Sequence, residues 1–205
     1  MKKHLIIWAV ALFCVFASSP LSAENCEDVV AKPTPAMAVT DLANVIDDDV
    51  QSMLENKLRV YFENTTIAMA VVVVPTMGGL DQNTYSVELF NCWGIGGQND
   101  CGILIFISVE ERKLSIRTGR GIEFIATDAD LSSITTDAMK PHLKINDYTT
   151  GIASGVNKII EHLNTISKGD LKDLIHKEQL AKEKAAQEAA YDRMVVAYIA
   201  VGIIL

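Results

Sequence analysis

Five carboxylate side chains stand where predicted strands end or predicted helices begin in this 205-residue sequence. Strand ends in an open α/β sheet gather at one edge, so we expect these side chains to lie together. Several carboxylate oxygens around one point suit a hard cation such as Ca²⁺ or Mg²⁺. Helix capping is the alternative role for the two that open a predicted helix. The candidate metal ligands are Asp41, Asp100, Glu123, Asp128 and Asp130.

Three arginines in the same region could bind an anion. A guanidinium group holds a phosphate by paired hydrogen bonds. A phosphomonoesterase also needs a nucleophile or an activated water, and an acid for the leaving group. No serine, cysteine or histidine stands in a recognisable nucleophile setting, so a solvated hairpin face is the alternative role. The candidate phosphate ligands are Arg112, Arg117 and Arg120.

The N-terminus has the residue order of a signal peptide. Lys2 and Lys3 precede an apolar run, and small residues lead to Ala23, after which we expect cleavage. The run is short for a membrane span of roughly 20 residues, which argues against an uncleaved anchor. Loss of the two lysines takes the net charge from −8 to −10, which argues against nucleic-acid binding and favours divalent cations or basic partners. The chain is therefore predicted to enter the secretory pathway and to act outside the cytoplasm.

Two of the cysteines bracket a glycine-rich loop. Cys92 and Cys101 flank Gly94-Ile95-Gly96-Gly97, and disulfides persist in exported chains, so we predict that these two pair. Cys26 is then left over, either free or in an intermolecular bond; three reduced thiols are the alternative. The loop is not a dinucleotide fingerprint, because a strand follows it where that motif requires a helix. Asn64-Thr65-Thr66 fits the N-glycosylation pattern of a eukaryotic host.

The hydrophobic pattern predicts the elements that position these residues. Apolar residues at i, i+3, i+4 spacing mark helices, and short β-branched runs mark strands buried on both faces. A charged turn between the last two strands predicts a hairpin. The whole predicts an α/β fold, a three-layer α/β/α sandwich with a mixed central sheet. Helices are expected over 50–63, 81–93, from 128 to a break near Pro141, and over 147–166; strands over 66–74, 102–109 and 112–118.

The chain divides into five predicted segments. The C-terminal twelve residues are wholly apolar but would reach only about 18 Å as a helix, less than the ~30 Å hydrocarbon core. They either start a transmembrane helix or form an interfacial or partner-binding end, and we favour the anchor. The segments are a signal peptide (1–23), an extended lead-in (24–38), a folded domain (39–167), a long charged helical spacer (168–193) and the apolar segment (194–205).

Short motifs over residues 39–166 resemble the TPM domain, the family of thylakoid-lumen, photosystem II repair and levamisole-receptor modulator proteins. The resemblance implies an α/β/α sandwich, and the order of signal, domain and membrane helix is similar to that of tethered members. This chain departs from the family at Cys101, where Asn is common, and at Arg120, where Tyr is common. The matching pieces are Val39-Thr40-Asp41-Leu42-Ala43-Asn44-Val45-Ile46, Trp93-Gly94-Ile95-Gly96, Gly102-Ile103-Leu104-Ile105, Glu111-Arg112-Lys113, Thr118-Gly119-Arg120-Gly121-Ile122-Glu123, Thr127-Asp128-Ala129, Pro141, Asp147-Tyr148 and Gly151-Ile152.

The resemblance implies two different functions. Some family members are auxiliary proteins of membrane complexes, and the two cysteines of the loop resemble those of secreted or cell-surface members. Others are acid phosphatases, and some bind calcium or similar divalent ions. We therefore expect an interaction or auxiliary module for a membrane protein complex or receptor, tethered to the membrane by its C-terminal segment. The alternative is a divalent-metal-dependent acid phosphatase.

Overall fold

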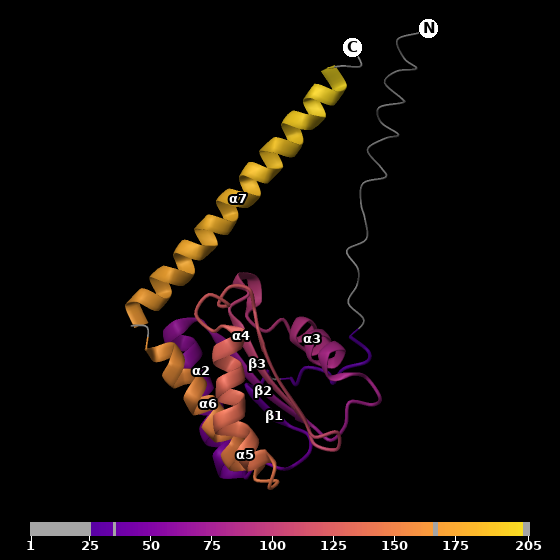
Figure 1. Cartoon of the computed structure of the whole chain (residues 1–205), viewed down its shortest axis with the longest axis vertical. Helices are drawn as coiled ribbons and strands as arrows, with labels where there is room; N and C mark the ends of the chain where they lie inside the picture. Colours follow the sequence, from indigo (N-terminus) through magenta and orange to yellow (C-terminus); the bar gives the residue numbers. More distant parts are fainter. Residues whose placement is uncertain (1–25, 35, 166–167, 203–205) are drawn as a thin grey trace.

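The computed structural model describes residues 26–34, 36–165 and 168–202 and has three layers (Figure 1). A four-stranded sheet forms the middle layer. Helices α2, α4, α5 and α6 cover one face, and α3 covers the other. The predicted α/β/α sandwich is therefore confirmed. The predicted signal peptide lies outside the described residues.

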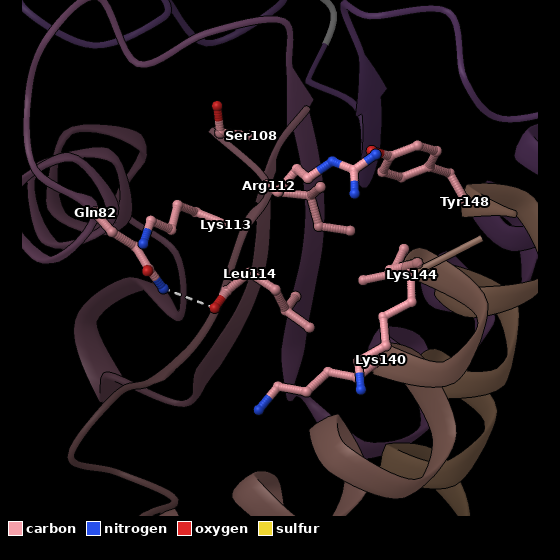
Figure 2. Close-up of a pocket in the computed structure, with 10 residues that line it drawn as sticks. Gln82, Ser108, Arg112, Lys113, Leu114, Lys140, Lys144 and Tyr148 are labelled. Carbon is pink, nitrogen blue, oxygen red and sulfur yellow. Dashed lines mark hydrogen bonds between the residues drawn. The ribbon is translucent and has the colours of Figure 1, made fainter. Parts of the chain in front are cut away.

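The central sheet is mixed, as predicted, with strand order β1-β2-β3-β4. The first three strands are parallel, and β4 runs antiparallel to β3. The expected hairpin is thus present, and its turn faces α5 and α6 across the hollow shown in Figure 2. The strands are β1 (Val39–Asp41), β2 (Ala68–Val74), β3 (Gly102–Ser108) and β4 (Lys113–Thr118).

The helices begin and end close to the predicted bounds. Near Pro141 the predicted break takes the form of a π-helical turn, Thr135–Met139, because proline supplies no amide to continue the α-helical ladder. A short 3₁₀ turn, Gly97–Asn99, interrupts the glycine-rich loop. The helices are α2 (Asp48–Thr65), α3 (Gln82–Trp93), α4 (Asp128–Ile134), α5 (Lys140–Leu143), α6 (Tyr148–Asn164) and α7 (Lys168–Gly202).

Alternation along β2 and β3 divides the interior into two apolar layers. Side chains such as Val71 and Ile105 pack against α2 and α6, while neighbours such as Val72 and Phe106 pack against α3. Since both faces are covered, nearly every residue of these strands is buried, which explains their unbroken apolar sequence. Tyr85 of α3 stacks on Phe106 with ring centroids 4.9 Å apart.

The two helical crossovers use opposite faces of the sheet. Helix α2 connects β1 to β2 on one face, and α3 connects β2 to β3 on the other. The strands meanwhile advance in one direction across the sheet. The crossovers must therefore have opposite hands, so one of them is left-handed, a rare arrangement in parallel sheets.

Helix α7 contains the predicted spacer together with residues 194–202 of the apolar segment. It leaves the domain beside α2 and extends well beyond it (Figure 1). Within the described residues, no helix is both long enough and apolar enough to cross a membrane.

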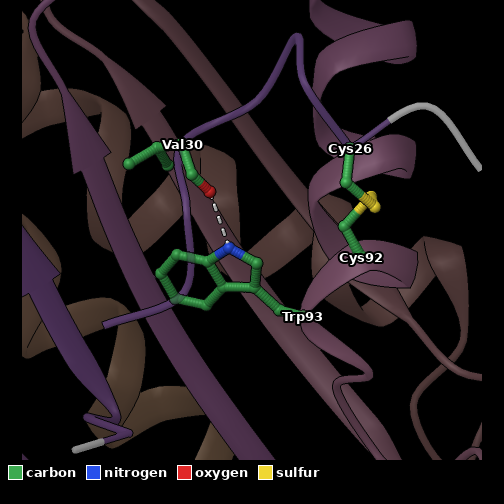
Figure 3. The surroundings of a disulfide bond; sticks show 4 residues. All are labelled: Cys26, Val30, Cys92 and Trp93. Carbon is green, nitrogen blue, oxygen red and sulfur yellow. Dashed lines mark hydrogen bonds between the residues drawn. A yellow bond between two sulfur atoms is a disulfide. The ribbon is translucent and has the colours of Figure 1, made fainter. Parts of the chain in front are cut away.

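The predicted pairing of Cys92 with Cys101 is wrong. Cys92 instead bonds to Cys26, with the two Cα atoms 5.7 Å apart (Figure 3), and Cys101 is a buried free thiol. The sheet itself explains the difference. Cys101 packs in the layer of α2 and α6, whereas Cys92 belongs to α3 and packs on the opposite face.

The disulfide fastens the lead-in segment onto α3. Trp93 donates its indole Nε1–H to the carbonyl of Val30 at 2.8 Å (Figure 3). The hydroxyl of Tyr85 accepts from the Val30 amide at 3.3 Å, and Lys32 Nζ donates to the Trp93 carbonyl at 2.6 Å. Part of the predicted extended lead-in is therefore a strap beside α3, with Val29 buried in the apolar layer between α3 and the sheet, and Trp93 anchors it.

Removing the disulfide with the double variant Cys26→Ser and Cys92→Ser should lower the free energy of unfolding by about 4 kcal/mol, because the bond closes a long loop in the unfolded chain. Its two cysteines are 66 residues apart. Denaturant titration measures this change. Cys101→Ala is the control, since it leaves the crosslink in place. Non-reducing peptide mapping that joined Cys92 to Cys101 would contradict the assignment.

Candidate functional site

A cleft of about 380 Å³ opens where β3 ends and β4 begins. One wall comes from the β3–β4 hairpin and the other from α5 and the start of α6 (Figure 2). Four cationic residues line it: Arg112, Lys113, Lys140 and Lys144. The floor is apolar, and the remaining lining is polar. We call this the basic cleft; its other lining residues are Gln82, Ile107, Ser108, Leu114, Leu143 and Tyr148.

Backbone conformation places Arg112 at the mouth of the basic cleft. Arg112 occupies the hairpin turn with φ of +54°, a left-handed conformation uncommon outside glycine. Its Nη2 donates to Asn146 Oδ1 at 3.2 Å, and Asn146 also has a positive φ, of +61°. The contact joins the hairpin to the loop before α6, so the guanidinium is oriented by the turn conformation and by the hydrogen bond to this loop.

Two of the lysines extend into the basic cleft, whereas the side chain of Lys113 extends toward Gln82, away from them (Figure 2). Lys140 and Lys144 lie one helical turn apart, joined by a backbone hydrogen bond of 3.0 Å, and extend toward the side that Leu114 lines (Figure 2). Lys113 opens strand β4 beside Gln82, whose Nε2 donates to the Leu114 carbonyl at 2.6 Å. Among the described residues, no carboxylate lies within 4.0 Å of the charged nitrogens of these four cations. The cleft therefore concentrates uncompensated positive charge on a chain whose net charge is −8.

The carboxylate nearest in sequence, Glu111, is fully engaged elsewhere. It accepts hydrogen bonds from the hydroxyls of Ser108 and Thr76 and from the Met77 amide. These bonds, that of Ser108 foremost, lower the pKa of Glu111 to about 2. So acidic a group cannot take the Ser108 proton near neutral pH, and Ser108 with Glu111 is not a nucleophile–base pair. Glu111 instead clamps the hairpin to the loop between β2 and α3.

The five candidate metal ligands do not converge on one point. Asp41 aligns with Val73, near the C-terminal end of the parallel strands. Asp100 precedes Gly102, which aligns with the first residue of β2 at the opposite end of the sheet. The expectation that these carboxylates share one edge is wrong because Asp41 ends its strand, whereas Asp100 precedes its own.

Three of these carboxylates have local hydrogen-bonding roles. Asp41 accepts from the amides of Ala43, Val45 and Ile46 at 2.7–3.0 Å and closes the loop into α2. Asp100 accepts from the Arg120 amide at 3.0 Å. Asp130 forms a capping box with Thr127, whose hydroxyl lowers the pKa of Asp130, and lies 3.5 Å from His162 Nε2. Helix capping, the alternative stated for Asp130, is confirmed.

Glu123 and Asp128 are exposed. Within the described part of the chain, no group of three or more His, Cys, Asp or Glu side chains is arranged to hold a metal ion. The residues in place therefore do not form the predicted ligand set, and Ca²⁺ or Mg²⁺ binding stays a prediction.

Arg112 lies apart from the other two candidate arginines. Arg112 belongs to the basic cleft, while Arg117 bridges β4 to α3 by donating from Nε to Ser86 Oγ at 2.9 Å and from Nη2 to Asn83 Oδ1 at 2.6 Å. Arg120 lies at the far end of β4, near Asp100. Arg117 and Arg120 share a second cavity of about 250 Å³, but its lining also includes the carboxylates of Asp100 and Glu123. Asn64 is exposed near the C-terminus of α2, and its glycosylation stays a prediction.

Sequence reasoning missed Lys140 and Lys144. Their i, i+4 spacing on either side of the Pro141 motif was a signal that they share one helical face. Nothing in the sequence, however, indicated that this face meets the Glu111-Arg112-Lys113 turn across a cavity.

Comparison with known proteins identifies the family. The model of the TPM domain matches residues 39–162, more than half of the sequence. The chain therefore belongs to the TPM domain family. A search of curated proteins finds no match.

Solved structures of bacterial proteins share the fold. The N-terminal domain of a protein from P. gingivalis is 27% identical with a TM-score of 0.59, over 63% of this chain and 83% of that one. The N-terminal domain of the cg2496 protein from Corynebacterium glutamicum is 18% identical with a TM-score of 0.51, over 68% and 88%. The BA42 protein from Bizionia argentinensis is 18% identical with a TM-score of 0.53, over 61% and 86%. At 18% identity, the last two support the fold alone.

Replacing Glu111 by glutamine should flatten the acid dependence of stability. The folded pKa of about 2 lies below the ordinary value of 4.5, so this carboxylate stabilises the fold above pH 4.5 and loses that effect as pH falls toward 2. Unfolding free energies measured between pH 6 and pH 2 should therefore fall less steeply in Glu111→Gln than in the wild type. Glu110→Gln is the control, because it leaves the three hydrogen bonds to Glu111 in place. Equal slopes in Glu111→Gln and the wild type would refute the clamp.

Proposed function

We propose that this chain is an extracytoplasmic interaction module that acts as an auxiliary subunit of a membrane protein complex. The domain binds its partner, and the C-terminal segment holds it at the membrane. The observation that carries the proposal is the composition of the basic cleft. It has charged groups and an apolar floor that suit binding, but its lining contains no carboxylate or imidazole to act as a general acid or base.

The disulfide supports the proposed location. Cys26 and Cys92 are bonded, and such bonds persist in oxidising compartments outside the cytoplasm. A strap fastened this way suits a domain that must remain folded after export, where its partner would be encountered.

Helix α7 supports the proposed tether. Its 35 residues extend about 52 Å, and residues 180–194 are all exposed. Its last described residues belong to the apolar segment, at the end remote from the domain (Figure 1). A charged, solvated helix between a folded domain and an apolar end would hold the domain away from the bilayer, at the height of a partner's exposed region.

Two aspartates in the apolar segment should release the chain from the membrane. The variant Val195→Asp with Val196→Asp opposes insertion, because an aspartate inside a membrane-spanning helix costs roughly 3 kcal/mol. The wild-type chain should stay in the membrane pellet after carbonate extraction and be crosslinked to an integral membrane protein. The variant should appear in the supernatant without that partner.

The control for this experiment is Lys177→Gln with Lys184→Gln, two exposed spacer positions. These substitutions change charge but leave the apolar segment intact, so the chain should remain in the pellet. A wild-type chain that is wholly carbonate-soluble would refute the tether, and one that crosslinks to no membrane protein would refute the auxiliary role.

Acid phosphatase activity is the second candidate, favoured by the four cations that could hold a phosphate. From the lining of the basic cleft we expect p-nitrophenyl phosphate hydrolysis at pH 5 and pH 7 to stay at background, with or without Ca²⁺ or Mg²⁺. The comparison proteins are Asp128→Ala, at a candidate metal ligand, and Lys140→Gln, in the cleft. Turnover by the wild type that either substitution abolishes would establish the phosphatase instead.

A further inference from the structure

We infer that the basic cleft is a docking site for an acidic peptide segment of the partner. The inference rests on the proposed function and names the chemistry by which the partner is recognised. The segment carries carboxylates on alternating residues, with an aliphatic residue between them.

Charge complementarity is the first argument. The cleft gathers Arg112, Lys113, Lys140 and Lys144 with no carboxylate within 4.0 Å of their charged nitrogens among the described residues. The chain as a whole is acidic, at −8. Such a local concentration of positive charge attracts anions and orients an incoming acidic partner, while the acidic remainder disfavours approach elsewhere.

The spacing of the cations is the second argument. One helical turn separates Lys140 from Lys144 by about 6 Å along the axis. Alternate side chains of an extended peptide are about 6.7 Å apart, so two carboxylates of one extended segment can meet both lysines. A single phosphate is better held by donors that converge on one point. Cations spread along a helix and across from it suit a row of carboxylates.

The floor of the cleft is the third argument. Ile107, Leu114 and Leu143 line it beneath the charged rim, and Ile107 is fully buried. In an extended segment the aliphatic side chain between two carboxylates points away from the lysines, so it would cover the half-buried Leu114 on the hairpin side and add apolar contact to the charge pairs. This arrangement selects acidic segments that alternate with apolar residues over uniformly charged ones.

Arg112 is oriented before any ligand arrives. Its hydrogen bond to Asn146 and its place in the hairpin turn fix one end of the side chain. A charged group already oriented loses less conformational entropy on binding. We therefore assign Arg112 the carboxylate at the end of the segment nearest the hairpin turn.

The test is fluorescence anisotropy with the full chain in mild detergent. The probe is a fluorescein-labelled peptide of alternating glutamate and leucine, and the control peptide has glutamine in place of glutamate. The glutamate peptide should bind more tightly than the control, and its affinity should fall as salt is raised. The variant Lys140→Gln with Lys144→Gln should weaken binding about tenfold. Both lysines are exposed, and circular dichroism checks that the variant remains folded.

The matched control is again Lys177→Gln with Lys184→Gln, which changes the net charge equally at exposed spacer positions and should leave binding within about twofold. Equal weakening by both double variants would overturn the inference, because the attraction would then come from net charge alone. The inference would also be overturned if inorganic phosphate displaced the labelled peptide at a lower concentration than unlabelled glutamate peptide does. Cleft-dependent binding to phosphatidylserine vesicles but not to the peptide would overturn it as well. Failure of peptide binding while the chain still crosslinks to a membrane protein would refute this site and leave the proposed function standing.

Discussion

Burial of strand β3 on both faces is the constraint on which the rest of the structure depends. All seven of its residues, Gly102–Ser108, are buried, and hydrogen bonds pair it with β2 on one edge and β4 on the other. Each fully buried isoleucine or phenylalanine contributes about 1.5–3 kcal/mol. A slip of one residue would exchange the two apolar sets between the layers, so the register is strongly specified. The positions of the glycine-rich loop and the hairpin turn follow directly, because each is attached to one end of this strand.

The two ends of the β3–β4 hairpin have different roles. At one end the backbones pack so closely that a Cβ atom on Gly119 would lie 2.0 Å from the Asp100 carbonyl oxygen, and one on Gly121 would lie 2.2 Å from that of Asn99. These glycines serve close packing rather than anion binding. At the other end, the turn is held by Glu111 and leaves a cleft open in front of it. The close backbone packing and the proposed recognition site thus lie at opposite ends of the same pair of strands.

The sequence alone was sufficient for the layers and the hairpin, because these depend on local periodicity. It was insufficient for the disulfide pairing and for the grouping of the carboxylates, because both depend on which face or end of the sheet a residue occupies. Cys92 and Cys101 are close in sequence but lie on opposite faces, and Asp41 and Asp100 lie at opposite ends. The usual right-handed crossover would put α2 and α3 on one face, so the left-handed crossover within the predicted sandwich could not be anticipated from element order. The basic cleft depends on how α5 is placed across from the hairpin, which local pattern does not encode.

The position of Cys101 has a consequence for the order of events during oxidative folding. In an extended chain Cys92 and Cys101 are nine residues apart, and short loops close faster than long ones. Random oxidation would therefore favour the non-native pair over the bond to Cys26. Once the sheet forms, burial raises the pKa of the Cys101 thiol and removes it from exchange. Formation of the Cys26–Cys92 bond thus requires that the strands assemble before oxidation, or that an isomerase rearrange an early Cys92–Cys101 bond. The fold itself therefore determines which disulfide persists.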